Sequence, residues 1–533
     1  MAQSVSQYSV QEVQQAHQEL TRADDLRKSG DMEGALEICE ELLESYSDYF
    51  SARLLTAVMY MQHGNYAGAL PHLVRARLVN ANDPTTLANL GKAYLELDAL
   101  ECAVEALEQS IALSPEESMP HYFMGELWLT RNDYERAGGY FQATLVRDPE
   151  HSSAMIRLGH CQASLGRYEE GLSTLKSALG LPITDDQKSH IYQILSEFPE
   201  PVEDSMDILS EISKLGAADT EGETEQDPGQ PVLYFTANIP FGELSQAFAR
   251  GIMFDKIGRH QEAWNAFTDV NKRIANDTVP QRALYFTQGE ALLDRARMWQ
   301  PRTKKKKTSS RKNGPISLFI LGPSRSGKTT LEKLVGLLDG VRLGYEHSIV
   351  TDTAQRASQR ADLLNEQFLA NLPSDANDLI SEIYHRELAA VAGDAQLFTI
   401  THPGAISDVG RLSDLVPDAR FVLLKRDLDD MAFRIFAYLY QADTNQFAYD
   451  IRDIYRYLEL YNRTVDIWAE KIGERVLVLS YEDMMKDPKA AIRRIAELCG
   501  MKPPENMDVQ IGSDVGIAAP YRDWLHAARD NAK

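Results

Sequence analysis

The chain has 533 residues, of which 44% are hydrophobic and 25% charged, and its formal net charge is −24. This length and composition predict a soluble protein of about two or three domains. The acidic charge argues against general nucleic-acid binding, which needs a basic surface. We expect no membrane span, because the first ten residues lack an apolar leader core and no apolar run is long enough to cross a bilayer. The four cysteines are far apart and fit neither a metal site nor a disulfide scaffold, so we expect a reducing, cytoplasmic setting.

The N-terminal part of the chain repeats itself every 34 residues. Small residues recur at two positions of the repeat: Ala23, Ala57, Gly91, Gly125 and Gly159 at the first, and Ala35, Ala69, Ala103, Ala137 and Gly171 at the second. This spacing predicts paired helices that approach closely at the small residues. Cys39 stands where other repeats have Leu73, Leu107, Phe141 and Leu175, so we interpret it as a core residue.

A period held over five units resembles the tetratricopeptide repeat. The resemblance implies an α-solenoid whose concave face binds a protein or peptide. A spacer or a dimerisation arm is the alternative interpretation.

The period lapses at Pro182. Residues 199–230 are acidic and proline-containing, which predicts a mobile loop. A later unit places Gly251, Phe254 and Ala263 at the tetratricopeptide positions but out of phase, and we interpret it as a cap that docks the array on the next domain. The basic polar segment 301–313 follows, which we interpret as a solvated linker; binding of nucleic acid or lipid is the alternative interpretation. The expected domains are a repeat array over 1–181, an acidic loop with degenerate capping helices over 182–300, a linker over 301–314 and an α/β domain over 315–533.

The α/β domain opens with the pattern of a phosphate-binding loop. A short apolar run begins at Ile316, a glycine-bounded turn runs from Gly322 to Gly327, and an apolar-periodic helix follows. Backbone N–H groups and the positive end of a helix dipole point into such a turn. Arg325 and Lys328 add charges, and Thr329 and Thr330 add hydroxyl donors. The stretch satisfies G-x-x-x-x-G-K-[ST], the pattern of loops that bind nucleoside triphosphates.

Further apolar runs alternate with helical patterns. The runs begin at Val341, Leu397, Arg420 and Arg475, and the longest helical patterns are Leu379–Ala392 and Ile451–Lys471. Strands that alternate with helices predict a three-layer α/β domain with a mostly parallel sheet. The loops that begin at Gly322, Gly344, Thr401, Lys425 and Ser480 should therefore share the carboxyl edge of the sheet.

Several segments of this half resemble sulfotransferases. The run GPSRSGKTTLE resembles the loop that binds the 5′-phosphosulfate of 3′-phosphoadenosine 5′-phosphosulfate (PAPS), and PDARFVLLKRDLDDMAFRIF resembles the motif that binds its 3′-phosphate. The block that starts at Ile451 ends in YEDM and CGM, similar to the family's Y-E-D-L and C-G-L. From residue 16 to about 525 the chain is similar to bacterial tetratricopeptide-sulfotransferase proteins, and its catalytic half is related to tyrosylprotein sulfotransferases.

The resemblance implies roles for particular residues. Residues around the 5′-phosphosulfate would be Arg325, Ser326, Gly327, Lys328, Thr329 and Thr330. Arg426 would hold the 3′-phosphate and Tyr481 would lie near the adenosine. Glu346 matches the catalytic base, with Arg325 and Lys328 beside the transferring group, and no metal is expected. A solvated or salt-bridged acid remains the alternative for Glu346, and an ion pair with Asp427 or Asp430 the alternative for Arg426.

The chain also departs from the family pattern. Lys328 replaces the first threonine of a T-T pair and thereby completes the triphosphate pattern. Arg434 stands where the family has a serine on the 3′-phosphate; it either binds that phosphate or points to solvent. The lysine of the family's D-K-x-P is absent, and His402 either substitutes for it or is structural. Ser513 keeps the spacing of the C-terminal motif, but the glutamine and the basic residue within that motif are replaced by Gly516 and Ala519.

Three hypotheses follow for the function. The first is a PAPS-dependent sulfotransferase acting on a hydroxyl of a protein, peptide or glycan, with the repeats docking the acceptor or a partner. The second is a P-loop NTPase or kinase that uses ATP or GTP with magnesium, although strand 421–424 runs into Lys425 and Arg426 rather than into a metal-binding acid. The third is a non-catalytic repeat adaptor with a degenerate nucleotide-binding domain.

Overall fold

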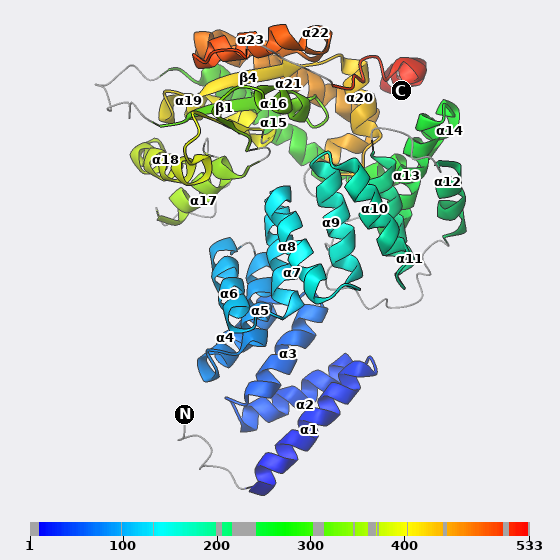
Figure 1. Ribbon diagram of the computed structural model, residues 1–533, viewed down its shortest axis with the longest axis vertical. Coiled ribbons are helices and arrows are strands. Elements are labelled where there is room, and N and C mark those ends of the chain that lie inside the picture. Colours follow the sequence, from blue (N-terminus) through cyan, green and yellow to red (C-terminus); the bar gives the residue numbers. More distant parts are fainter. Residues whose placement is uncertain are drawn as a thin grey trace. The chain divides into compact units, whose positions relative to one another are not determined.

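The computed structural model describes residues 10–97, 99–131, 133–198, 205–215, 241–301, 314–344, 347–360, 369, 372–401, 403–440, 445–504 and 511–530. The chain divides into two compact units, residues 1–187 with 219–231 and residues 188–218 with 232–533 (Figure 1). Nowhere in the described ranges is a helix both long and apolar enough to cross a membrane.

The first unit is an array of helical pairs. The helices are α1 Val10–Lys28, α2 Met32–Ser45, α3 Phe50–Gln62, α4 Tyr66–Val79, α5 Pro84–Glu96, α6 Leu100–Leu113, α7 Ser118–Thr130, α8 Tyr134–Arg147, α9 Ser152–Ser164 and α10 Tyr168–Leu179. The second helix of three pairs begins after a polar residue whose side chain accepts a bond from a backbone N–H of the first turn: Asp31, Asn65 and Asp133. These caps satisfy donors that a helix start leaves without partners, and the predicted array of paired helices is confirmed.

The pairs pack by placing a glycine against a large side chain. A Cβ atom built on Gly91 would lie 2.4 Å from Leu107, and one built on Gly125 would lie 2.5 Å from the Phe141 ring. Both partners are fully buried. The 34-residue period is therefore a packing period, because the small residue of one helix makes room for the large residue of the next. Cys39 is buried as expected, and burial raises the pKa of its thiol to about 11.

We expect Gly125→Ala to destabilise the array by about 1–2 kcal/mol, because overpacking against Phe141 outweighs the gain in helix propensity. Gly139→Ala, in α8 of the same pair, is the matched control. No atom lies within 4 Å of a Cβ built there, so it should stabilise α8 by up to about 1 kcal/mol. Hydrogen exchange of α7 and α8 in the full chain measures both effects. Equal shifts for the two variants would contradict this packing.

The second unit begins within α11 Asp185–Ser196 and continues with further helices: α12 Ser205–Lys214, α13 Phe241–Lys256, α14 His260–Asp277 and α15 Val279–Met298. A Cβ atom on Gly251 would lie 2.4 Å from Phe267, so the out-of-phase pair α13–α14 packs as the regular repeats do. Its buried face, including Phe248 and Phe267, forms one core with Phe433 of helix α20 (Leu428–Phe436). The expected loop over 199–230 is wrong at 205–214: α12 lies there, because Ile208 and Ile212 provide an apolar face that is buried. Residues 199–204 and 216–230 of that prediction lie outside the described residues.

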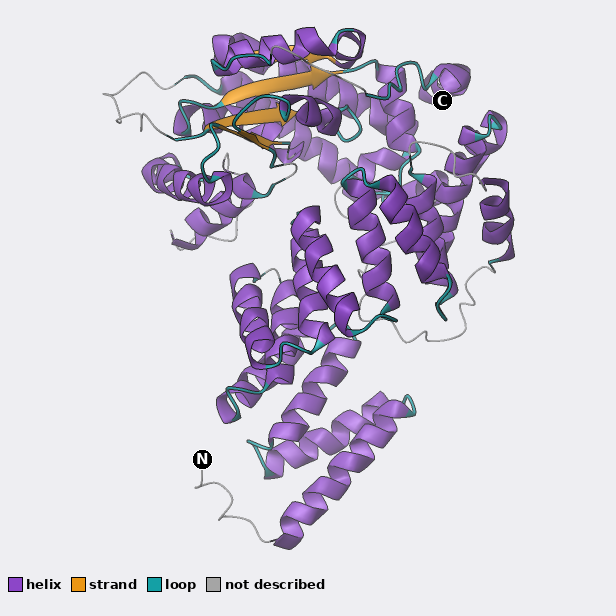
Figure 2. Cartoon of the chain, viewed as in Figure 1, coloured by secondary structure: helices purple, strands orange, loops and turns teal. Residues whose placement is uncertain are grey.

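A five-stranded parallel sheet follows, as the sequence predicts (Figure 2). Its strands are β1 Ile316–Leu321, β2 Val341–Arg342, β3 Leu397–Ile400, β4 Arg420–Lys425 and β5 Val476–Ser480, in the order β2-β3-β1-β4-β5. The helices are α16 Lys328–Val335, α17 Ile349–Arg360, α18 Asn377–Ala392, α19 Val409–Leu415, α20 Leu428–Phe436, α21 Ile451–Ile472, α22 Tyr481–Lys486, α23 Pro488–Cys499 and α24 Arg522–Asp530.

Alternate residues of the central strands face opposite cores. Phe319 of β1 and Phe421 of β4 stack on each other in a core that includes α18, α19 and α21. Ile320 and Val422 face the second core, formed with α16, α22 and α23. The sheet thus lies between two helical layers, and because its strands are parallel, the loops after β1, β4 and β5 meet at one edge.

Candidate functional site

The loop between β1 and α16 has a backbone that requires glycine at both ends. A Cβ atom on Gly322 would lie 2.2 Å from Ser326 Oγ. Gly327 has a φ of +95°, and a Cβ there would lie 2.4 Å from the Tyr481 ring. Arg325 also has a positive φ, 67°, which is uncommon for a residue with a side chain. The turn therefore curls tightly before α16, in the form that presents backbone N–H groups to an anion.

Polar side chains line this loop. Lys328 is the first residue of α16 and is buried. Ser326 is buried too, and its Oγ has no hydrogen-bond partner among the described residues. Thr329 is exposed and Thr330 half-buried, both in the first turn of α16. A buried hydroxyl without an acceptor, beside a lysine and a helix N-terminus, fits a loop that holds an anionic group.

Arg426 joins the end of β4 to this loop. Its Nη1 donates to the carbonyl of Arg325 over 3.1 Å, and its guanidinium lies 4.1 Å from the centre of the Tyr481 ring. The side chain is 1% exposed. Asp427 does not pair with it and instead caps α20, accepting from the backbone N–H groups of Asp429 and Asp430 over 3.0 Å each. The β1 loop, the end of β4 and the start of α22 therefore form one continuous site.

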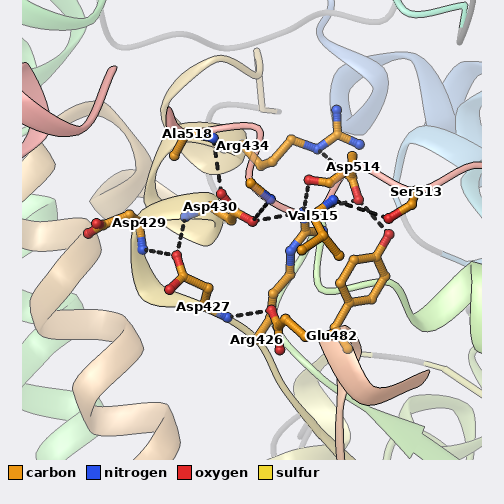
Figure 3. A network of polar contacts seen from close by, with 12 residues as sticks. Arg426, Asp427, Asp429, Asp430, Arg434, Glu482, Ser513, Asp514, Val515 and Ala518 are labelled. Atoms are coloured by element: carbon orange, nitrogen blue, oxygen red, sulfur yellow. Dashed lines mark hydrogen bonds and ion pairs between the residues drawn. The ribbon is translucent and has the colours of Figure 1, made fainter. Parts of the chain in front are cut away.

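A second arginine reaches the same place from α20. Arg434 Nε lies 3.0 Å from Asp514 Oδ2, and Arg426 Nη2 lies 3.0 Å from Asp514 Oδ1. Figure 3 shows the Asp514 carboxylate between the two guanidinium groups. The hydroxyl of Tyr481 donates to the same carboxylate. Arg426 thus has Asp514 as its main ionic partner, while Asp430 Oδ2 lies farther away, at 4.0 Å.

The charges around this carboxylate shift several pKa values. Burial by itself raises the pKa of Asp514, but Arg434 and Arg426 outweigh it and hold that pKa below the usual value. Burial lowers the pKa of Arg434, and repulsion from Arg325 and Arg426 lowers it further. Burial, together with the bond to Asp514, raises the pKa of Tyr481 to about 12. The position between the arginines therefore strongly favours an anion.

The segment that carries Asp514 is fixed by Asp430. Both oxygens of this buried carboxylate accept backbone N–H bonds, from Gly516 over 2.6 Å and from Ala518 over 3.0 Å. Ser513 lies on the same segment and is exposed, and its Oγ accepts a long bond from Val515 N, at 3.4 Å. The predicted residues Arg426 and Arg434 are thus brought together at one anion position, and Ser513 directly precedes the residue that occupies it.

We expect Asp430→Ala to destabilise the protein by about 3 kcal/mol, because two backbone donors lose a charged acceptor and one of them is buried. Asp483→Ala, which removes an exposed acid from the first turn of α22, should cost no more than about 0.5 kcal/mol. Urea unfolding of the full chain measures both. If Asp430→Ala cost as little as the control, the two bonds from Gly516 and Ala518 to Asp430 would contribute little to the free energy of unfolding.

A carboxylate from the helical part of this unit faces the phosphate loop. Glu197 Oε2 lies 3.6 Å from Arg325 Nη2, and the Arg325 guanidinium lies 3.5 Å from the centre of the Tyr438 ring. Burial raises the pKa of Glu197, while Arg325 opposes that shift. No sequence pattern identified Glu197 or Asp514, although Asp514 directly follows the predicted Ser513.

Glu346 and His402 lie outside the described residues. The chain leading to Glu346 is described as far as Gly344, whose N–H donates to Thr399 Oγ1 over 3.0 Å. A Cβ atom on Gly344 would lie 2.3 Å from the carbonyl oxygen of Thr399, so position 344, two residues after the end of β2, has to be glycine. Thr399 in turn donates to the buried carboxylate of Glu332 in α16. Gly344, the last described residue before Glu346, is therefore tied through Thr399 to the helix that follows the phosphate loop.

Comparison with known proteins gives matches for both halves of the chain. Residues 315–505 match the sulfotransferase family, and residues 20–85, 60–118 and 122–186 match the tetratricopeptide repeat. A DnaJ protein P58IPK homolog of Arabidopsis thaliana is 22% identical over 330 residues, which cover 55% of this chain and 67% of that protein. Among solved structures, MamA is 22% identical with a TM-score of 0.27 and matches 30% of this chain and 92% of its own. The tetratricopeptide protein TTC0263 of Thermus thermophilus is 19% identical with a TM-score of 0.31 and matches 34% of this chain and 98% of its own.

Proposed function

This chain joins tetratricopeptide repeats to a C-terminal sulfotransferase family domain, and from that premise we propose that it moves a sulfuryl group from PAPS to a hydroxyl of a protein, peptide or glycan. The observation that carries the proposal is a second anion position beside the phosphate loop. Arg426 bonds to the backbone of Arg325 and, together with Arg434, holds a carboxylate. PAPS has a 3′-phosphate for such a position in addition to its 5′-phosphosulfate, whereas ATP and GTP have none.

The residues at the loop fit the 5′ end of PAPS. The N–H groups before α16, the unpartnered Ser326 hydroxyl and the buried Lys328 provide donors and positive charge. We assign the 5′-phosphosulfate to residues Arg325–Thr330, the 3′-phosphate to Arg426 and Arg434 with Ser513 at its margin, and a place beside the adenosine to Tyr481.

PAPS supplies the activated sulfuryl group. In the transfer, the S–O bond to the 5′-phosphate breaks, a bond from sulfur to the acceptor oxygen forms, and 3′-phosphoadenosine 5′-phosphate (PAP) leaves. Lys328 and Arg325 would stabilise the charge that develops on the oxygens around the transferred group. Glu346 would take the proton of the acceptor hydroxyl. The proposal needs no metal ion, because these cations provide the charge that magnesium supplies to triphosphates.

The repeat array is assigned to recognition. Residues 1–181 would dock the acceptor protein or a partner on the concave face that such arrays form. The helices between the array and the linker 301–314 would connect it to the transferase domain. The setting we propose is the cytoplasm, with no nucleic acid as partner.

Calorimetric titration of the full chain tests the proposal, with PAP in one experiment and with ATP or GTP plus magnesium in the others. We expect PAP to bind without a metal. Binding of a triphosphate only with magnesium would instead favour an NTPase or kinase, for which the GKT sequence at residues 327–329 is the supporting feature. Absence of binding in all three titrations would favour a repeat adaptor with a degenerate domain.

A further inference from the structure

The position assigned to the 3′-phosphate already holds an anion that belongs to the chain. Asp514 Oδ1 lies 3.0 Å from Arg426 Nη2, and Asp514 Oδ2 lies 3.0 Å from Arg434 Nε. The Tyr481 hydroxyl donates to the same carboxylate. Arg426 Nη2 also donates to the Asp514 backbone carbonyl over 3.0 Å. A phosphate group needs the same arginine donors, so it and the Asp514 side chain cannot both occupy them.

We propose that Asp514 sets the affinity of this site for a 3′-phosphorylated nucleotide by competing with the 3′-phosphate for Arg426 and Arg434. The inference rests on the proposed function, because it takes that pair as the 3′-phosphate subsite. Asp514 is a specificity-determining residue in this scheme: its carboxylate penalises PAPS and PAP but leaves nucleotides without a 3′-phosphate unaffected.

The carboxylate has a defined route of release. Asp430 holds the backbone of the segment through Gly516 and Ala518, so the segment stays in place when the Asp514 side chain turns. The Asp514 side chain is 23% exposed, and its neighbours Ser513 and Val515 are exposed. A change of side-chain rotamer toward solvent therefore takes the carboxylate away from both guanidinium groups without moving the main chain, and the bond from Arg426 to the Asp514 backbone carbonyl stays in place.

Competition of this kind has a measurable signature. The observed affinity for PAP is the intrinsic affinity multiplied by the fraction of molecules in which Asp514 has left the arginines. If that fraction is about a tenth or less, removing the carboxylate tightens PAP binding by about tenfold or more. A nucleotide that lacks the 3′-phosphate, such as AMP, does not use the pair and gains nothing.

The experiment compares wild type with Asp514→Asn, Asp514→Glu and Asp523→Asn as full chains, titrated with PAP and with AMP. We expect Asp514→Asn to bind PAP at least about tenfold more tightly, with AMP affinity within about twofold of wild type. Asp514→Glu keeps the negative charge and should stay within about threefold of wild type for PAP. Asp523→Asn removes an equal charge from an exposed site in α24, and salt screening should limit its effect on PAP to about twofold. Thermal unfolding with and without PAP gives a second readout, in which PAP should raise the melting temperature of Asp514→Asn more than that of wild type.

The outcomes separate this inference from the proposed function. Tight PAP binding by wild type that Asp514→Asn leaves unchanged or weakens would overturn the role of Asp514 and leave the sulfotransferase proposal standing. An equal gain for PAP and AMP would also overturn it, because the carboxylate would then block the whole site. Failure of wild type and Asp514→Asn alike to bind PAP would overturn both.

Discussion

Lys328→Ala is expected to lower the rate of sulfuryl transfer by about a hundredfold to a thousandfold, the loss seen when a donor to a developing negative charge is removed. Lys328 begins α16 and is buried directly after a glycine that lies in the left-handed region. A cation in that position acts with little solvent screening, so its charge is worth more than that of a surface lysine. The rate is measured as release of PAP from PAPS at saturating PAPS.

Lys333→Ala is the matched control, because Lys333 lies in the same helix but is exposed. It should change the rate by less than about twofold, since exposed charges are screened over about 10 Å at moderate salt. Equal losses for the two variants would mean that α16 contributes only general positive charge. If Lys328→Ala kept the full rate of sulfuryl transfer, Lys328 would not be a catalytic residue. The inference that it takes the place of the first threonine in the family's T-T pair would then be weakened.

The repeats and the sheet could be predicted because local sequence determines them. Ala and Gly recur where helices have to approach closely, and the large residue that fills each space, such as Leu107 or Phe141, recurs with them. The strands at Ile316, Leu397 and Arg420 are short apolar runs that end in polar loops, and parallel order then brings those loops to one edge. Much of the candidate site follows from this order alone.

What could not be predicted depends on contacts between residues far apart in the sequence. Asp514 lies 88 positions after Arg426. Its pairing depends on the backbone bonds from Gly516 and Ala518 to Asp430, which no local pattern reveals. Glu197 reaches Arg325 from a helical segment that precedes the α/β domain. Helix α12 was missed for a different reason: the acidic composition of residues 199–230 outweighed the few apolar residues that form its buried face.

Glu346→Gln is expected to lower transfer to a hydroxyl acceptor by at least about a hundredfold while PAP affinity stays nearly unchanged, because glutamine keeps the shape of the side chain but cannot take a proton. Transfer of radiolabelled sulfate from PAPS to peptides that present serine, threonine or tyrosine measures the rate, and calorimetry with PAP measures the affinity. Equal loss of both quantities would show that Glu346 is structural.

Glu197 is an alternative candidate for the general base, and the same transfer assay tests it. Glu197 lies 3.6 Å from Arg325, and burial raises the pKa of its carboxyl, which is the direction that suits a general base. Glu197→Gln removes one charge beside the phosphate loop, so we expect tighter PAP binding and only a small change in transfer. A hundredfold loss of transfer in Glu197→Gln, with full transfer in Glu346→Gln, would assign the base to Glu197. The acceptor hydroxyl would then have to approach the loop from the side of the helices α11 and α13, so the helical part of this unit, and not only the repeat array, would orient the acceptor for transfer.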